Sequence, residues 1–354
     1  MYTKVVNLVP PQLSDQAIKE KIICIRGHRE RMFNISYEQI NNQFVFHNYG
    51  HGGAGWTFLF GCVNESLRQF EQQVAHHPSL KKQAITVIGA GCYGLLTAIE
   101  LVRRDYNVHI VAREQTDISS HKAAGFFFPR PRKVSNELET AIFHARGIES
   151  YQTYLSIIKG SHPFITHGPK LLPAYYDINI DPGFTPYVAH KLVTPPQTIT
   201  IDFGNGKKYP AHQYETLFIN PAALMDELTY LIKQLRIPIV KQEIEKFDDL
   251  DESIIFNCAG LGAKKLTNDL RLIPVQGHLI TLQQQPIEQL QYLINFKVTM
   301  PAAKGNYLRD ELLYFAPKNE GILGITFIRG QDSLTNNQHE FDRLLERAHL
   351  FFGT

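Results

Sequence analysis

Apolar residues spaced three or four positions apart predict several helices along this chain. The last of them places Phe341, Leu344, Leu345 and Ala348 on one face. Together the predicted helices cover about Trp56 to Phe70, Leu95 to Val102, Glu137 to Ile158 with an interruption at Gly147, Asn220 to Leu235, and Asn337 to Phe352.

Runs rich in β-branched and aromatic residues predict strands between these helices. They include residues 22–29, a hairpin formed by 34–40 and 43–47, and a mostly antiparallel region over 160–211. Residues 71–83 are polar and contain Pro78, so they are predicted to form a linker.

A short apolar strand, a glycine-rich turn, a helix and a second strand follow one another over residues 84–114. This is the size of a β-α-β unit of about 30 residues. The turn has glycines at 89, 91 and 94, the spacing that makes a tight turn, admits a pyrophosphate and lets the helix pack on the strand. Glu114 lies where an acid can bond a ribose hydroxyl, and Arg113 beside it can reach a phosphate or the adenine. The segment therefore predicts a dinucleotide site.

Residues 47–57, H-N-Y-G-H-G-G-A-G-W-T, crowd glycines and histidines between a strand and a helix. Glycines let the backbone approach a ligand closely, and the first N–H groups of the helix point back into the loop. The loop therefore predicts a site for electron-rich oxygens, with an ordinary glycine-rich turn as the alternative. His47 and His51 have no further metal ligands beside them and are predicted to be structural.

Composition excludes several classes of function. The 354 residues, 44% of them apolar, suffice for one large core or two intertwined domains. A formal net charge of +2 gives no general attraction to nucleic acid, and no apolar run approaches the ~20 residues that cross a bilayer. Four widely spaced cysteines indicate neither a disulfide framework nor a metal site. We expect a cytoplasmic protein without metal, nucleic-acid or membrane partners.

Further short motifs accompany these two segments. The full set is V-I-G-A-G-C-Y-G (87–94), V-A-R-E (111–114), S-S-H-K-A-A-G (119–125), F-N-C-A-G-L-G-A (256–263), P-V-Q-G-H (274–278), L-Y-F-A-P (313–317), C-I-R-G-H-R (24–29) and the 47–57 loop. Together they resemble the D-amino-acid oxidase and glycine oxidase family of FAD-dependent flavoproteins over most of the chain.

The resemblance implies an α/β fold, in which a Rossmann-like FAD-binding domain is interleaved with a mostly antiparallel α+β substrate domain. The FAD-binding domain would take residues 32–130 and 212–268. The substrate-binding domain would take residues 1–31, 131–211 and 269–354.

The resemblance also implies the candidate site. Arg26 matches the arginine that binds the substrate carboxylate, and Tyr314 matches the tyrosine whose hydroxyl joins it, whereas the role of Arg29 stays open between substrate and structure. The 47–57 loop, with Gly53 in the catalytic set, would stabilise negative charge on the flavin. FAD contacts are implied for Gly50, Gly52, Gly55, Trp56, Thr57, Gly89, Gly91, Gly94, Arg113, Glu114, Ser119, Ser120, Ala123, Ala124, Gly125 and Gly260.

The order of these motifs differs from that of the family. There the nucleotide-binding strand comes first and the R-x-x-R strand and glycine-rich loop lie towards the end, whereas here both precede it. A circular permutation, joined through residues 71–83, is the simplest interpretation, and an error in the gene model is the alternative. The permutation predicts that residues 47–57 lie beside 89–94 and 123–125 around one flavin.

The implied reaction is oxidation of a D-amino acid or a related small amine, such as glycine or sarcosine, by hydride transfer from Cα to flavin N5. The products would be a 2-oxo acid, ammonia and, with O₂ as acceptor, hydrogen peroxide. A dehydrogenase with another electron acceptor and a catalytically inactive FAD-binding protein are the alternatives. The substrate side chain, the oligomeric state and any covalent link to FAD stay open.

Overall fold

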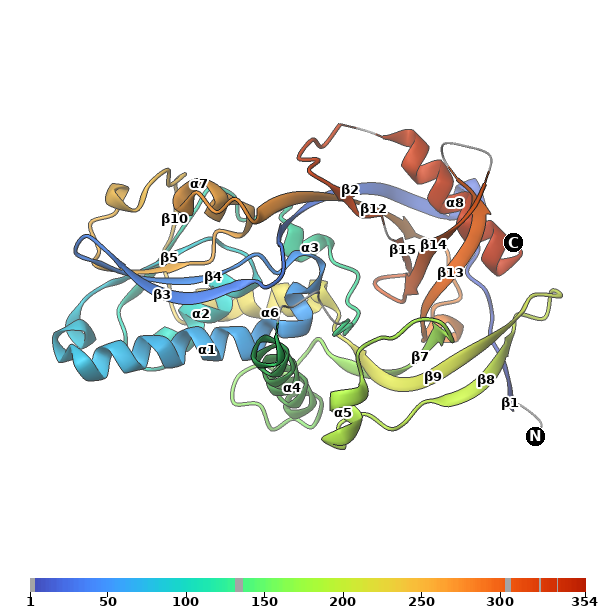
Figure 1. The fold of residues 1–354 in the computed structure, drawn as a ribbon, viewed down its shortest axis with the longest axis horizontal. Coiled ribbons are helices and arrows are strands. Elements are labelled where there is room, and N and C mark those ends of the chain that lie inside the picture. The colour runs from blue at the N-terminus through green and yellow to red at the C-terminus, as the bar shows by residue number, and fades with distance from the viewer. Residues whose placement is uncertain (1–3, 131–135, 303–306, 325, 336) are drawn as a thin grey trace.

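The computed structural model describes residues 4–130, 136–302, 307–324, 326–335 and 337–354. In this part of the chain a six-stranded sheet and a ten-stranded sheet lie next to each other, and helices pack on both (Figure 1). The protein therefore has the mixed α/β fold with parallel and antiparallel sheets that the sequence predicts.

The six-stranded sheet is the Rossmann-like part of the molecule. Its strands lie in the order β10 (Ile239–Lys241), β6 (Val108–Ala112), β5 (Ile85–Ile88), β11 (Ile254–Asn257), β4 (Gln43–Tyr49) and β3 (Asn34–Ile40). All neighbours are parallel except the β3–β4 hairpin. Every residue of β5 and β11 is buried, because both faces of a parallel sheet are covered and its strands are continuous apolar runs.

Helices cover this sheet. The main ones are α1 (Gly55–His76), which follows β4, α2 (Cys92–Val102), which joins β5 to β6, α4 (Glu137–Ile158) and α6 (Pro221–Gln234). Asn136 and Asn220 each cap a helix with their side chains, and Pro221 stands at the first turn of α6, as helix-start chemistry predicts. The shorter helices are α3 (Ser119–Lys122), α5 (Thr185–Ala189) and α7 (Ala263–Thr267).

The ten-stranded sheet contains strands from both ends of the chain. Its strands are β1 (Lys4–Asn7), β8 (Gln197–Asp202), β9 (Lys208–Phe218), β7 (Lys170–Asp177), β13 (Leu293–Pro301), β14 (Leu308–Ala316), β15 (Ile322–Gly324), β12 (Leu272–Leu282), β16 (Ile328–Arg329) and, paired with β12, β2 (Ile18–Arg29). The antiparallel pairs β7–β9 and β8–β9 confirm the antiparallel region predicted over 160–211. Helix α8 (Gln338–Phe352) packs its predicted apolar face into the core beneath this sheet.

Two expectations about the helices are wrong. Residues 71–76 are not a linker but the last turns of α1, and a 3₁₀ helix follows at Pro78–Lys82. The polar residues of these turns lie mostly exposed, and the helix ends at His76 because Pro78 disfavours helical backbone at the residue before it. Helix α4 also continues through Gly147. The glycine serves packing there, since a Cβ would meet Tyr187 and Phe58.

The division into two domains stays a proposal. Its boundary at residues 211 and 212 falls within β9, a strand of the ten-stranded sheet.

Among the described helices, none is long and apolar enough to cross a membrane.

Candidate active site

Several loops meet at one edge of the six-stranded sheet. Strands β4, β5, β6 and β11 are parallel, so the segments that follow them emerge at the same edge. Strands β2 and β12 of the other sheet extend towards this edge (Figure 1). A Cβ at Gly27 of β2 would lie only 2.9 Å from the backbone N of Leu261, which follows β11. The candidate site therefore lies where the two sheets meet.

The turn between β5 and α2 has no room for side chains. Gly89 has φ +105°, and a Cβ there would lie 2.6 Å from the carbonyl O of Cys258. A Cβ at Gly94 would overlap the carbonyl O of Gly89, so the helix packs directly against the turn. At Gly91, the N-cap of α2, a Cβ would lie 3.2 Å from Oγ of Ser120. This geometry follows the roles that the fingerprint assigns to its three glycines.

The 47–57 loop contacts this turn. The hydroxyl of Tyr93 donates to the carbonyl O of Gly55 at 2.7 Å, and the Tyr93 ring stacks on His51 with centroids 3.8 Å apart. Gly50 and Gly52 both have positive φ, and Gly52–Ala54 forms a short 3₁₀ turn before α1. Residues that the chain separates by more than thirty positions therefore lie side by side.

Residues 119–125 join the same cluster. Oγ of Ser120 accepts from the N–H of Cys92 at 3.1 Å, and its carbonyl O accepts from Nε1 of Trp56 at 3.1 Å. Oγ of Ser119 donates to the carbonyl O of Ile25 at 2.6 Å. Oγ1 of Thr57 accepts from the N–H of Phe128 at 3.2 Å. The segment thus bridges the β5–α2 turn, the 47–57 loop and β2.

Arg26 reaches this cluster from β2. Its side chain is buried, and Nη2 donates to the carbonyl O of Thr326 at 2.8 Å. The guanidinium lies between two glycines, since a Cβ at Gly277 would be 2.6 Å from Nη2 and a Cβ at Gly53 would be 3.3 Å from Nη1. Among the described residues, Nε of Arg26 has no hydrogen-bond partner. The cation therefore borders the glycine-rich loop with donor capacity remaining.

Tyr314 lies within electrostatic range of Arg26. It pairs in register with Gly324 across β14 and β15, and the absence of a side chain at Gly324 leaves space for its ring. The ring also contacts Phe126, with centroids 5.1 Å apart, and so borders the 119–128 segment. Burial raises the pKa of the Tyr314 hydroxyl, while the charge of Arg26 opposes the shift. The hydroxyl is therefore a protonated donor beside a cation.

Lys318 is a site residue that the sequence reasoning missed. It is 6% exposed, and Nζ donates to the carbonyl oxygens of His121 at 2.5 Å and Ala123 at 2.9 Å. Burial lowers its pKa to about 8. Its charge and that of Arg26 both act on the buried Cys24 thiol, whose pKa burial nevertheless raises. The only sequence signal was a lysine directly after the apolar run L-Y-F-A-P.

Two predicted cofactor residues lie apart from these contacts. Arg113 pairs with Glu243 at 3.4 Å and Glu114 with Lys241 at 3.9 Å, and all four side chains are more than half exposed. Both residues follow β6 at the same sheet edge. Their assignment to the adenosine end of FAD stays a prediction.

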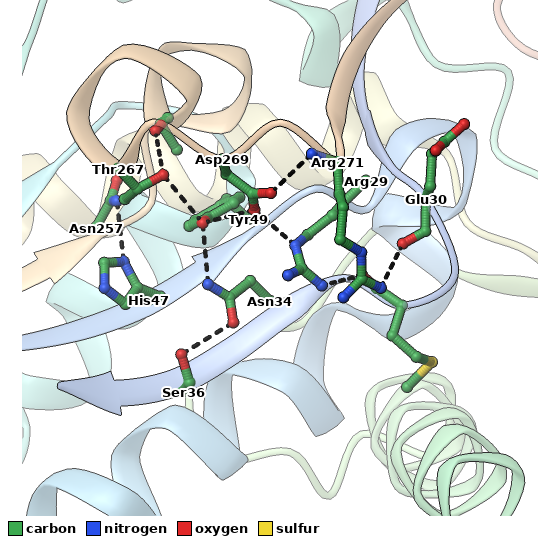
Figure 2. A network of polar contacts seen from close by, with 12 residues as sticks. Arg29, Glu30, Asn34, Ser36, His47, Tyr49, Asn257, Thr267, Asp269 and Arg271 are labelled. Atoms are coloured by element: carbon green, nitrogen blue, oxygen red, sulfur yellow. Dashed lines mark hydrogen bonds and ion pairs between the residues drawn. The ribbon is translucent and has the colours of Figure 1, made fainter. Parts of the chain in front are cut away.

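A polar network next to the site contains the second arginine of the R-x-x-R motif (Figure 2). Arg29 donates from Nε to Oδ2 of Asp269 at 2.6 Å and from Nη1 to the carbonyl O of Met32 at 2.9 Å. His47 is bonded through Nε2 to Glu38 at 2.7 Å and through Nδ1 to Asn257 at 3.1 Å. These contacts hold strands and loops together, which favours the structural interpretation of both residues.

Comparison with known proteins gives one family match. The family model described as FAD dependent oxidoreductase matches residues 84–354. A human D-aspartate oxidase is 27% identical over 220 residues, which cover 58% of this chain and 61% of that protein. The chain therefore aligns with about three fifths of the length of this curated relative.

Solved structures resemble the chain more remotely. An L-amino acid deaminase from Proteus vulgaris has a TM-score of 0.45 at 13% identity, covering 70% of this chain and 61% of that one. An iminodiacetate oxidase from Chelativorans sp. BNC1 has a TM-score of 0.43 at 12% identity, covering 76% and 79%.

Proposed function

The chain belongs to the family of FAD dependent oxidoreductases, and we propose that it oxidatively deaminates a D-amino acid or a related small amine such as glycine or sarcosine. Hydride transfer leaves an imino acid, which water hydrolyses to a 2-oxo acid and ammonia, or to methylamine where the substrate is sarcosine. With O₂ as the electron acceptor the other product is hydrogen peroxide. The observation that carries the proposal is the position of Arg26, a buried cation set between Gly53 of the glycine-rich loop and Gly277 of β12. We place the protein in the cytoplasm as part of the same proposal.

The residues present fit FAD, the cofactor of this family. The β5–α2 turn would form the cradle: a Cβ at Gly89 or Gly94 would meet a backbone carbonyl, so only glycine allows this turn, and the N-terminus of α2 faces it. Gly89, Gly91 and Ser120 would hold the pyrophosphate, while the 47–57 loop and residues 123–125 would border the flavin. When bound, FAD supplies the two-electron acceptor for a hydride from the substrate carbon.

The side chains of the site bind and orient the substrate. The guanidinium of Arg26 binds the carboxylate through its planar fork, and the protonated hydroxyl of Tyr314 adds a further donor. With the carboxylate held, the Cα–H is directed towards the cofactor and the amine reacts in its neutral form. Orientation is the contribution of the chain, and we assign no side-chain base.

Anaerobic mixing of the FAD-loaded protein with D-amino acids, glycine and sarcosine tests the proposal. We expect at least one of them to bleach the visible flavin band, and bleaching by none would exclude the enzymatic function. Peroxide formed in air is then compared with turnover of a dye acceptor. Good dye turnover without peroxide would identify a dehydrogenase rather than an oxidase.

A variant separates the carboxylate assignment from the activity as a whole. Arg26→Leu should lose bleaching at substrate concentrations that saturate the wild-type protein, because the carboxylate has no cationic partner. Arg29→Leu is no suitable control, since it would break the network around Asp269. Exposed Lys81→Leu, which removes a cation outside the site, serves instead, with FAD content measured alongside.

A further inference from the structure

Thr326, whose backbone carbonyl accepts a hydrogen bond from Arg26, is itself hydrogen-bonded to the buried His278. We propose that Thr326 and His278 are positioning residues that orient Arg26 towards the substrate carboxylate. The inference rests on the proposed function and adds two residues to its site that the sequence reasoning did not identify.

The contacts form a continuous chain from His278 to Arg26. The hydroxyl of Thr326 accepts from the backbone N–H of His278 at 3.0 Å and lies 2.6 Å from Nδ1 of the same residue. The backbone carbonyl of Thr326 accepts from Nη2 of Arg26 at 2.8 Å. Thr326 is 8% exposed and His278 is fully buried. One threonine thus connects strand β12 to the guanidinium through both its side chain and its backbone.

Thr326 needs this second contact because of its place in the chain. It lies between β15 and β16, outside both strands, so its carbonyl has no place in a regular ladder. The two bonds between its hydroxyl and His278 fix the side chain of Thr326, and with it the direction of the carbonyl that accepts from Arg26. Because the carbonyl of Thr326 holds Nη2 of Arg26, Nη1 of the same guanidinium lies next to Gly53 and the 47–57 loop.

The state of His278 suits this role. Burial and the charge of Arg26 both lower its pKa, so the imidazole is neutral and does not repel the guanidinium. The ring packs edge-on against Phe341 of α8, with centroids 4.9 Å apart. Since the hydroxyl of Thr326 already accepts from the backbone, it can donate its own hydrogen to Nδ1. Nε2 has no hydrogen-bond partner among the described residues.

The arrangement makes a specific prediction about binding. If Thr326 loses its hydroxyl, its carbonyl is no longer fixed and the guanidinium samples other directions. Carboxylate binding then weakens, because two-point recognition depends on the direction of the fork. Reaction of a substrate already bound should change less, so KM should rise more than kcat falls.

The experiment measures propanoate binding to the FAD-loaded protein through the change in the visible flavin spectrum. Thr326→Val should weaken binding about tenfold or more, while Thr326→Ser, which keeps the hydroxyl, should restore affinity to within about threefold of wild type. His278→Gln should give an intermediate loss, because the backbone N–H of residue 278 still reaches Thr326. Propanamide, which has no charge, should bind weakly to the wild-type protein and with the same affinity to all variants.

The outcomes separate this inference from the proposed function. If Arg26→Leu abolishes propanoate binding but Thr326→Val does not weaken it, the positioning role is refuted and the proposed function stands. Equal losses in Thr326→Ser and Thr326→Val would also refute it, since the hydroxyl would then be irrelevant. If wild-type protein does not bind propanoate, the carboxylate site and the inference both fail. Should Thr326→Val not fold, His278→Gln alone decides, and wild-type affinity in it refutes the role.

Discussion

Asp269 accepts a hydrogen bond from Nε of Arg29 at 2.6 Å, and this pair fastens the end of β2 to the loop before β12. The same carboxylate accepts from the hydroxyl of Tyr49 at 3.0 Å (Figure 2). The two arginines of the R-x-x-R motif thus differ: Arg29 has a carboxylate partner, whereas Arg26 donates to the backbone carbonyl of Thr326. We infer that Arg29 stabilises the fold that presents Arg26.

Asp269→Asn should therefore destabilise the protein without touching the substrate. Burial raises the pKa of Asp269, but hydrogen bonds from Arg29 and Tyr49 outweigh it and hold the pKa below its usual value. A lowered carboxyl pKa stabilises the fold above the unfolded pKa near 4, and this contribution is lost as pH falls through the folded pKa. Urea unfolding should show a loss of about 2 kcal/mol at pH 7 that shrinks below pH 4. Exposed Glu243→Gln should cost about 0–1 kcal/mol at either pH.

Gly277→Ala should displace the guanidinium of Arg26. The new Cβ would lie 2.6 Å from Nη2 and 3.3 Å from Sγ of Cys24, and the flexible arginine end moves more easily than the strand. We expect KM to rise about tenfold or more, a loss of about 1.4 kcal/mol in binding. The control is Gly262→Ala, whose φ is −60° and whose nearest neighbour would be Ala259 Cβ at 3.5 Å. Equal KM values in the two variants would contradict the placement of Arg26.

Gly94→Ala should prevent FAD binding. Its Cβ would overlap the backbone carbonyl of Gly89, and neither helix nor turn can give way without opening the cradle. Overpacking of this kind costs about 1–3 kcal/mol. Gly262→Ala meets only Cβ of Ala259 at 3.5 Å, so it should keep more flavin. The ratio of flavin absorbance to protein absorbance after purification measures both, and the reverse order would be incompatible with the cradle.

Local spacing accounts for what the sequence predicted correctly. Gly89, Gly91 and Gly94 act within one β-α-β unit, so their spacing carries the geometry of the turn. Arg26 and Thr326 lie 300 residues apart, and no periodicity connects them. The prediction of a linker over residues 71–83 was wrong for a related reason. The polar residues after Phe70 are also those of an exposed helix face, and only the packed structure distinguishes the two. Lys318 was missed because its partners are backbone carbonyls, which leave no trace in the sequence.

Lys318→Met should change the pH dependence of stability. Burial lowers the pKa of Lys318 from 10.5 to about 8, so between these values the unfolded chain holds a proton that the folded chain has released. The wild-type protein therefore gains stability relative to the variant as pH rises through this window, by about 3 kcal/mol in total. Below pH 8 both states are protonated and the difference is constant.

Urea unfolding of both proteins without FAD, at several pH values from 7 to 10.5, measures this difference. Taking the difference cancels the buried cysteines and tyrosines, whose raised pKa values act with the opposite sign. For exposed Lys241→Met, the difference in unfolding free energy from wild type should not change with pH. A flat series for Lys318→Met would show that the ammonium is not buried in the folded protein.

We infer that the chain is a circular permutation, because the family match begins at residue 84 while the preceding segment supplies core strands. Strand β4 lies between β11 and β3, and β2 pairs with β12 along its length. Both terminal elements contact the β8–β9 hairpin: β1 pairs with β8, and Nδ2 of Asn205, in the turn, donates to the carbonyl O of Phe352 at 2.7 Å. A reordered chain that runs from residue 83 to 354 and then, through a flexible linker of about 10 residues, from 1 to 82 should therefore fold and bind FAD. Circular dichroism, flavin content and the urea midpoint compare it with wild type. Residues 83–354 alone should not fold, because they lack β2 and β4. A reordered chain that stays unfolded under conditions where wild type folds would refute the permutation.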